Sequence, residues 1–403
     1  MHTPRQTRGF FVLEALNSLG TTYYFYYLYF FTEKEFAFTK GQNLALAAGL
    51  GLTYGISSIV GGRFAQKRGY FSALKLGLGL MCVLMASGAW VRPLLAQIVI
   101  MAAATFAMAL TWPALEALVS EGESPQRLQR NIGIYNIIWA GFGAVAYFSG
   151  GALINAGGFR AMFLVPAAIQ ALQLAFAWRL ERSGATAAWQ GTGAGAHPVL
   201  EEDDREKQRS PVSPAMFLKM AWLANPFAYL AIQTVVAVIP ALAQRLGLSV
   251  VWAGIICSVW LFVRTASFAL LWLWDGWHYR FRWLMTAYAT MALSFVAMLI
   301  APNLAVLLIA QTLFGLSLGL IYYSSLYYSM HVGDTKGEHG GFHEAMIGAG
   351  SCAGPAVGAL SLHFLPQYSS SGTVAVGVLL LGGLVGLVGM RVLNSKNQIP
   401  KTK

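Results

Sequence analysis

The chain contains 403 residues, 57% of them hydrophobic and 11% charged, and its mean hydropathy of +0.57 argues against a soluble globular protein. The formal net charge of +11 would suit a nucleic-acid ligand, but the placement of the charges described below excludes that interpretation. Stretches long and apolar enough to cross ~30 Å of hydrocarbon fill the sequence. In chain order they run roughly over 9–31, 43–64, 71–91, 95–120, 131–155, 159–180, 215–243, 249–274, 282–300, 304–330, 340–365 and 370–391. We therefore predict an all-α polytopic membrane protein with twelve transmembrane helices.

A charged linker divides the predicted helices into two sets of six. We expect an amino-terminal six-helix bundle over residues 1–180, a cytoplasmic linker over 181–214 and a carboxyl-terminal six-helix bundle over 215–403. The linker passes from the Gly/Ala-rich GATAAWQGTGAGAHP into the mixed-charge EEDDREKQR, a composition typical of a connector. The first stretch lacks a cleavage site and holds Glu14 and Asn17, so we expect a retained helix and not a signal peptide.

The positively charged residues predict the orientation. Five of them lie in the odd-numbered loops, and Arg264 lies inside a predicted helix. The even-numbered loops, the linker and both termini carry the other 21: Arg5, Arg8, Arg63, Lys67, Arg68, Lys75, Arg127, Arg130, Arg179, Arg182, Arg205, Lys207, Arg209, Lys219, Arg280, Arg282, Lys336, Arg391, Lys396, Lys401 and Lys403. Because cytoplasmic loops of membrane proteins are enriched in Lys and Arg, we expect both termini in the cytoplasm and the protein in the plasma (inner) membrane.

An internal repeat emerges when the sequence is shifted by 207 residues without gaps. Glycines of the two halves then coincide: Gly69 with Gly276, Gly133 with Gly340, Gly141 with Gly348, Gly143 with Gly350, and residues 151–153 with residues 358–360. The matches fall at corresponding predicted helices. The two halves are therefore predicted to be parallel repeats, with a substrate site between them near the bilayer midplane.

The segment GRFAQKRG at residues 62–69 is similar to the signature loop between helices two and three of the major facilitator superfamily. A weaker echo, DGWHYR, occupies residues 275–280, and glycine-rich stretches at 141–151 and 348–358 resemble the family's helix-five motif. With the six-plus-six topology, the whole chain resembles that family. Gln66 departs from the pattern, because the family usually has an acid there. The resemblance implies alternating access around a cavity lined by helices one, four, seven and ten.

The sequence contains no ATP-binding Gly-x-x-x-x-Gly-Lys-Ser/Thr loop, and no catalytic triad or metal-hydrolase signature can be assembled from it. We expect no enzyme activity, no cofactor and no metal site; His339 and His343, four residues apart, are explained more simply by loop polarity. The expected partners are a small-molecule substrate, protons as a coupling ion and the lipid bilayer, whereas the oligomeric state is undetermined. The predicted function is secondary active transport of a small organic anion. A lipophilic-compound efflux pump and a non-transporting receptor on the same fold are the alternatives.

Ionisable residues within a hydrocarbon layer are costly and therefore mark candidate sites. Arg264 precedes Asp275 by 11 residues, which places it ~16 Å from the cytoplasmic end of its helix. It either binds a substrate anion or forms a structural ion pair. Glu14 is the candidate proton-coupling residue, or else lies shallow enough to reach cytoplasmic water. Asn17 follows Glu14 in the same helix and is a candidate substrate-binding residue.

Tyrosines are concentrated in the first and tenth predicted helices, and they predict a wall for a ring-bearing or amphipathic substrate. From these runs we select Tyr24, Tyr323 and Tyr327 as candidate substrate-binding residues. Interfacial belt tyrosines are the alternative, since both runs approach a membrane surface.

Charged residues near the cytoplasmic ends of the helices predict a gate. We expect Glu116 to pair with a basic loop residue such as Arg68, in the manner of a structural ion pair. Two clusters across the halves would hold the gate shut: Arg63, Lys67 and Arg68 facing Glu338 and Glu344, and Asp275 facing Arg127 and Arg130. Independently solvated charges, worth at most ~1 kcal/mol a pair, are the alternative.

Overall fold

The computed structural model describes residues 3–120, 123, 125–185, 212–332 and 336–398. All secondary-structure elements among these residues are helices. The amino-terminal group consists of α1 (Pro4–Phe36), α2 (Lys40–Arg68), α3 (Tyr70–Gly88), α4 (Leu94–Met108), α5 (Trp112–Ser120), α6 (Pro125–Gly157) and α7 (Phe159–Leu180), followed by the π-helical turn η1 (Glu181–Ala185). The carboxyl-terminal group consists of α9 (Pro214–Arg245), α10 (Val250–Cys257), α11 (Val259–Leu273), α12 (Phe281–Ile300), α13 (Leu304–Val332), α14 (Lys336–Phe364) and α15 (Ser371–Gln398).

Within the described residues, eleven helical segments are long and apolar enough to cross a membrane. Two of these segments are broken helices, because α4 and α5 form one of them and α10 and α11 another. The remaining long helix, α1, has 33 residues and carries Glu14, Asn17 and a run of tyrosines. The predicted fold class, a polytopic all-α membrane protein, is confirmed.

Local sequence signals define several helix ends. Thr39 and Gln42 form a capping box at the start of α2, in which each side chain accepts a hydrogen bond from the backbone of the other. Ser213 caps α9, and its side chain accepts a hydrogen bond from the backbone of Met216. Gly69 is the single residue between α2 and α3 and has φ = 94°, a conformation that suits glycine. The signature-like loop is thus a one-residue turn.

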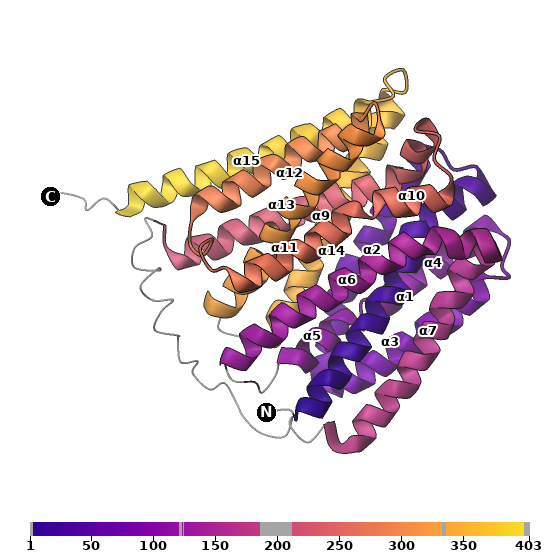
Figure 1. The fold of residues 1–403 in the computed structure, drawn as a ribbon, viewed down its shortest axis with the longest axis horizontal. Coiled ribbons are helices and arrows are strands. Elements are labelled where there is room, and N and C mark those ends of the chain that lie inside the picture. Colours follow the sequence, from indigo (N-terminus) through magenta and orange to yellow (C-terminus); the bar gives the residue numbers. More distant parts are fainter. Residues whose placement is uncertain (1–2, 121–122, 124, 186–211, 333–335, 399–403) are drawn as a thin grey trace.

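The two groups of helices pack against each other through α2 with α14 and through α6 with α10 and α11 (Figure 1). Gly151 of α6 packs against the backbone of Val250 and Val251, and Gly358 of α14 packs against Leu44 of α2. These two contacts are equivalent in the repeat, because Gly358 lies 207 residues after Gly151 and Leu44 lies 207 residues before Val251. The internal repeat therefore has a counterpart in the two interfaces between the groups.

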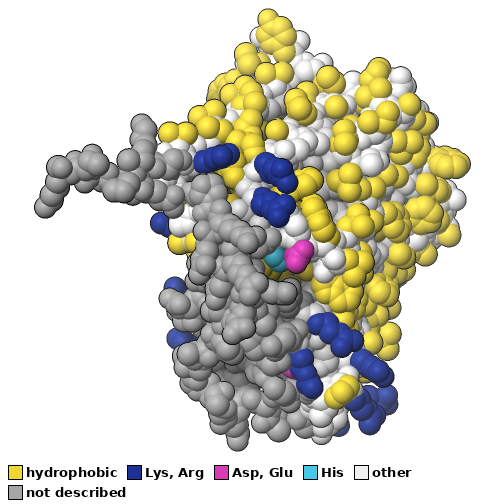
Figure 2. All heavy atoms as spheres, turned by 60° about the vertical axis from the view of Figure 1, so that its left-hand side comes forward, with side chains coloured by type: hydrophobic (Ala, Val, Ile, Leu, Met, Phe, Trp, Pro, Cys, Tyr) yellow, Lys and Arg dark blue, Asp and Glu magenta, His cyan; other side chains and the backbone are white. Residues whose placement is uncertain are grey.

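One end of the bundle, here called the linker face, holds the end of α7 and the starts of α1, α6, α9 and α14. Figure 2 looks toward this face and shows Lys and Arg side chains in two groups, with many hydrophobic side chains on the coloured surface beside them. Large apolar side chains are exposed on the outer faces of the helices, among them Leu52, Val83, Leu172, Leu293 and Val385. An exposed apolar band beside a charged end is expected of a protein that crosses a bilayer.

Candidate functional site

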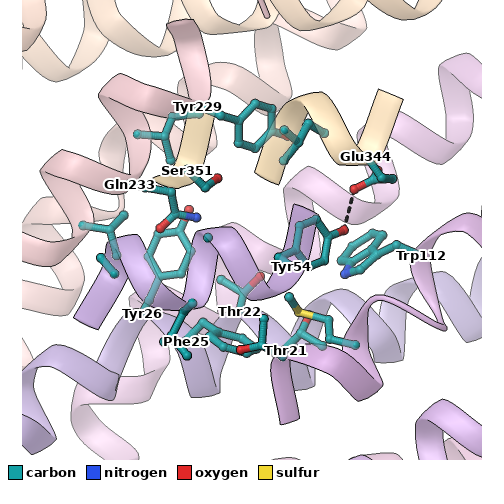
Figure 3. Close-up of a pocket in the computed structure, with 18 of the residues that line it drawn as sticks. Thr21, Thr22, Phe25, Tyr26, Tyr54, Trp112, Tyr229, Gln233, Glu344 and Ser351 are labelled. Carbon is teal, nitrogen blue, oxygen red and sulfur yellow. Dashed lines mark hydrogen bonds between the residues drawn. The ribbon is translucent and has the colours of Figure 1, made fainter. Parts of the chain in front are cut away.

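A cavity of about 170 Å³ lies between the two groups of helices. Both groups contribute to its wall, which is mostly aromatic and apolar with a few polar side chains. The lining residues are Thr21, Thr22, Phe25, Tyr26, Tyr29, Ala47, Leu50, Gly51, Tyr54, Thr105, Met108, Trp112, Trp139, Tyr229, Ile232, Gln233, Val236, Arg264, Tyr322, Glu344, Ile347 and Ser351. Figure 3 shows Glu344, Tyr54 and Trp112 on one side of it, and Tyr26, Gln233 and Ser351 on another.

The break between α4 and α5 brings Trp112 to the cavity. Pro113 follows Trp112 and has no backbone N–H, so a continuous helix through this position would lack a hydrogen bond. Thr111 donates its hydroxyl hydrogen to the carbonyl of Met108 at 2.8 Å, which satisfies one carbonyl at the interruption. The helix restarts at Trp112, whose ring lies beside Glu344 in Figure 3.

Arg264 lies in α11 and is 2% exposed. Aromatic rings surround its guanidinium group: the distance from Cζ to the ring centroid is 4.5 Å for Trp139, 5.1 Å for Tyr322 and 5.4 Å for Phe268. Nη2 donates a long hydrogen bond of 3.4 Å to the Tyr229 hydroxyl, and Nε has no hydrogen-bond partner. Among the described residues Arg264 has no ion pair, so the structural ion pair considered above is not formed.

Glu344 of α14 is 4% exposed and accepts a hydrogen bond from the Tyr54 hydroxyl of α2. Its carboxyl group also lies within hydrogen-bonding distance of the carboxyl group of Glu116 in α5. Tyr54 and Glu116 belong to the amino-terminal group, so both contacts join the two groups of helices. A hydrogen bond between two carboxyl groups requires at least one proton.

Glu14 is fully buried in α1, and neither of its carboxyl oxygens has a hydrogen-bond partner. It lies beside the Tyr135 hydroxyl, outside hydrogen-bond geometry, and close enough to Glu116 and Glu344 for their charges to interact. This position does not agree with the alternative of a shallow residue in contact with water. Asn17 is also fully buried, and its side-chain amide has no hydrogen-bond partner. Neither residue lines the cavity.

The tyrosines selected from the sequence lie outside the cavity. Tyr24 packs edge-to-face on Phe163 of α7. Tyr323 packs on Trp277, and the Tyr327 hydroxyl lies 3.1 Å from Nδ1 of His278. The cavity is lined instead by their neighbours Tyr26, Tyr29 and Tyr322, together with Tyr54, Tyr229, Trp112 and Trp139, which the sequence analysis did not select.

The tyrosines of α1 do not form an interfacial belt, which was the alternative interpretation of this run. Tyr23, Tyr24 and Tyr27 are at most 2% exposed and lie inside the protein. Their neighbours in the same run, Tyr26 and Tyr29, face the cavity. The run therefore packs within the bundle and does not anchor the helix at a membrane surface.

Among the residues whose side chains are described, the charges expected to form the gate are not paired across the two groups of helices in this structure. Asp275, Arg127 and Arg130 are exposed and, among the described residues, form no ion pair. Arg63, Lys67 and Arg68 are likewise exposed, and Gln66 is partly buried beside them.

Glu116 and Glu344 differ most from that expectation. Because both carboxyl groups point into the bundle, they contact each other and not the loop cations. The side chain of Glu338 lies outside the described residues.

Comparisons with known proteins agree with this architecture. The family model of the Major Facilitator Superfamily matches residues 10–359. A comparison with curated protein sequences finds no significant match. Solved structures with a similar fold include a peptide transporter POT in complex with sulfate (TM-score 0.73, 14% identity, 98% of this chain and 96% of that one). The nucleoside transporter NupG is also similar (TM-score 0.68, 14% identity, 96% and 99%), as is an inward-facing, unoccupied bacterial homologue of the human lysosomal transporter Spinster (TM-score 0.63, 13% identity, 98% and 96%).

Proposed function

Because this chain belongs to the Major Facilitator Superfamily, we propose that it is a secondary active transporter that carries a small organic anion through the central cavity by alternating access. The environment of Arg264 is the single observation that supports an anionic substrate. A guanidinium group stays charged in proteins, and here it lies in the cavity wall with no carboxylate partner among the residues that the structure describes. A substrate carboxylate or phosphate would supply that partner.

The surroundings of Arg264 are suited to holding an anion without neutralising the arginine first. The faces of Trp139 and Tyr322 attract and orient the guanidinium group, but they carry no net charge. Nε remains free to donate, so a planar anion can accept two parallel hydrogen bonds from Nε and an Nη atom. The other aromatic side chains offer apolar faces to the body of the substrate.

We assign the coupling proton to Glu14. An ionised carboxylate without a partner is expensive to bury in a membrane protein, whereas the protonated form is tolerated. Glu14 has no cation beside it among the described residues, and it lies near the carboxyl groups that join the two groups of helices. Binding and release of a proton there would change the interaction of Glu14 with those groups as the halves move.

The proposal also includes the membrane in which the protein lies, its orientation and its division into two bundles. The excess of Lys and Arg in the even-numbered loops supports a plasma (inner) membrane protein with cytoplasmic termini. On this view residues 1–180 and 215–403 form the two six-helix bundles, and residues 181–214 form a cytoplasmic linker between them.

Substitution of Arg264 tests the function. The purified protein is first screened by thermal shift against a library of organic acids, since a ligand of the folded form raises the melting temperature. Uptake of the strongest binder is then measured in proteoliposomes. Arg264→Lys should weaken binding, because the charge remains and the paired geometry is lost, and Arg264→Gln should weaken it by about tenfold or more.

Arg160→Gln is the matched control. Arg160 also lies over a tryptophan, with Cζ 4.6 Å from the centroid of Trp90, but it is exposed and outside the cavity. Normal binding and uptake by a folded Arg264→Gln protein would contradict the proposal. Binding without uptake in the unsubstituted protein would indicate a receptor.

A further inference from the structure

The cavity contains two ionisable groups of opposite sign that do not neutralise each other. Arg264 comes from α11 and Glu344 from α14, and both line the same space. Among the described residues, Arg264 has no ion pair and Glu344 has no basic partner. Opposite charges in a low-dielectric site attract strongly, so two that are held apart leave room for something between them.

Rigid neighbours hold the two groups apart. Arg264 is fixed by Trp139 and by the Tyr229 hydroxyl, whereas Glu344 is fixed by the Tyr54 hydroxyl and by Glu116.

Two tyrosines of the cavity wall, Tyr229 and Tyr322, lie near both charged residues. Both tyrosines are close enough to interact electrostatically with Arg264 and with Glu344. Among the described residues, the two charged groups therefore share these aromatic neighbours without forming an ion pair with each other.

We propose that the transported molecule is a small zwitterion, whose anionic group binds Arg264 and whose ammonium group binds Glu344 and Glu116. This inference rests on the anion transport proposed above. It adds a second charged group, so that Arg264 is the positive pole and Glu344 the negative pole of the cavity. One such molecule would satisfy both ends of the cavity at once, which an anion alone cannot do.

The Glu344 end has the donors and acceptors that an ammonium group requires. Tyr54 occupies one carboxyl oxygen of Glu344, which leaves the other oxygen and the Glu116 carboxyl group to accept N–H hydrogens. An ammonium group carries three such hydrogens and can bridge the two carboxyl groups when both are ionised. The Trp112 ring beside Glu344 can also attract the cation through its face (Figure 3).

Other charged groups nearby do not provide a competing cation. Glu14 adds a further acidic group behind the pair, and the buried His343 packs its ring on Tyr322, 5.6 Å between centroids. Elsewhere in the cavity wall, Tyr26, Gln233 and Ser351 offer an aromatic face, an amide and a hydroxyl to the rest of the molecule. The class of ligand is thus an amino acid or a similar amino-carboxylate compound.

The test uses the full-length protein and probes that differ only in charge. The first set is L-phenylalanine, N-acetyl-L-phenylalanine, which keeps only the negative charge, and L-phenylalanine amide, which keeps only the positive charge. The second set is the series of unbranched ω-amino acids from glycine to 8-aminooctanoate, each compared with the carboxylic acid and the amine of equal length. Melting temperature is measured as a function of probe concentration.

The expected result is that at least one zwitterion half-saturates the stabilisation at a concentration about tenfold or more below both of its singly charged analogues. The ω-amino acid that binds best reports the distance between the poles. If the N-blocked acids bind as tightly as the zwitterions and Arg264→Gln abolishes both, the anion function stands and the zwitterion inference is wrong. Absence of stabilisation by every probe also overturns it.

Substitution at the second pole gives an independent readout. Glu344→Gln keeps the shape but removes the charge, so zwitterions should lose their advantage while N-blocked acids bind at least as well as before. Glu35→Gln, an exposed carboxylate in a 3.9 Å ion pair with Arg92, is the matched control and should change neither. If Glu344→Gln does not fold, the probe series on the unsubstituted protein still decides the matter. An unchanged preference in a folded Glu344→Gln protein refutes the assignment of the pole.

Discussion

The contact between α2 and α14 depends on Gly51, which leads to a quantitative prediction. A Cβ placed on Gly51 would lie 2.5 Å from the backbone nitrogen of Cys352 and 2.5 Å from the backbone carbon of Ser351. Both atoms are backbone, so no side-chain rotation can relieve the overlap. In Gly51→Ala the two helices must therefore separate by about 1 Å to restore an ordinary van der Waals distance.

The cost of this overlap can be estimated. Overpacking by one methyl group at a well-packed contact typically costs about 1–3 kcal/mol. If only the arrangement with α2 and α14 in contact pays this cost, the equilibrium between arrangements shifts away from it by about 5- to 150-fold. Gly49→Ala is the matched control, because Gly49 lies on the same helix with open space around its Cβ position.

The shift can be measured as a distance between spin labels at the ends of the two groups opposite the linker face. Glu35→Cys in α1 and Gln367→Cys in the α14–α15 loop are exposed and place one label in each group. We expect Gly51→Ala to add a population with a longer distance and Gly49→Ala to leave the distribution unchanged. Identical distributions and melting temperatures for both variants would refute the argument that close helix approach holds this arrangement.

Three further outcomes are expected. A reporter that is active only outside the cytoplasm, inserted at residue 195, should be inactive; strong activity would reverse the proposed orientation. Glu14→Gln should abolish accumulation driven by a pH gradient but leave exchange down a substrate gradient, and unchanged accumulation in liposomes would remove Glu14 from coupling. Lys75→Met should lower the melting temperature more than Arg92→Met, because the 2.6 Å pair of Lys75 with Glu181 is partly buried whereas the pair of Arg92 is exposed. Equal shifts in the two variants would contradict this ranking.

Hydropathy predicts the fold of this protein well because the bilayer imposes one length and one polarity on every helix. It cannot show where a helix breaks: the interruptions before Trp112 and at Ser258 lie inside single apolar stretches. The family resemblance predicted a loop over residues 62–69, whereas in the structure residues 62–68 belong to α2 and only Gly69 forms the turn.

The cavity was less predictable, for reasons that differ between residues. Arg264 is the single charged residue in an apolar predicted helix. Burying a charge in a membrane costs free energy, so the sequence already indicated a functional role for Arg264. The tyrosine run of α1 covers every face of the helix, and no periodicity distinguishes Tyr26, which lines the cavity, from Tyr24, which packs on α7. Contacts with other helices decide between them, and these are absent from the sequence.

Glu344 was misplaced because the start of its helix was misjudged. The predicted stretch began near residue 340, which left Glu344 at a loop edge, but α14 already begins at Lys336. At 1.5 Å per residue, Glu344 therefore lies about 12 Å inside the helix. Glu344 is 4% exposed and lines the cavity, so its loop-like surroundings in the sequence were misleading.

The two halves of the internal repeat share their helix contacts but differ in their charged residues. The shift of 207 residues relates the Gly151–Val251 contact to the Gly358–Leu44 contact, so the glycine contact between the groups of helices occurs twice. The charges are not duplicated, because Ser57 stands at the position equivalent to Arg264, and Ile137 at the position equivalent to Glu344. Both charged residues belong to the carboxyl-terminal group of helices, Arg264 in α11 and Glu344 in α14. A molecule bound to Arg264 and Glu344 would thus have its two main contacts in one group of helices, and Tyr54 and Glu116 would add contacts from the other group.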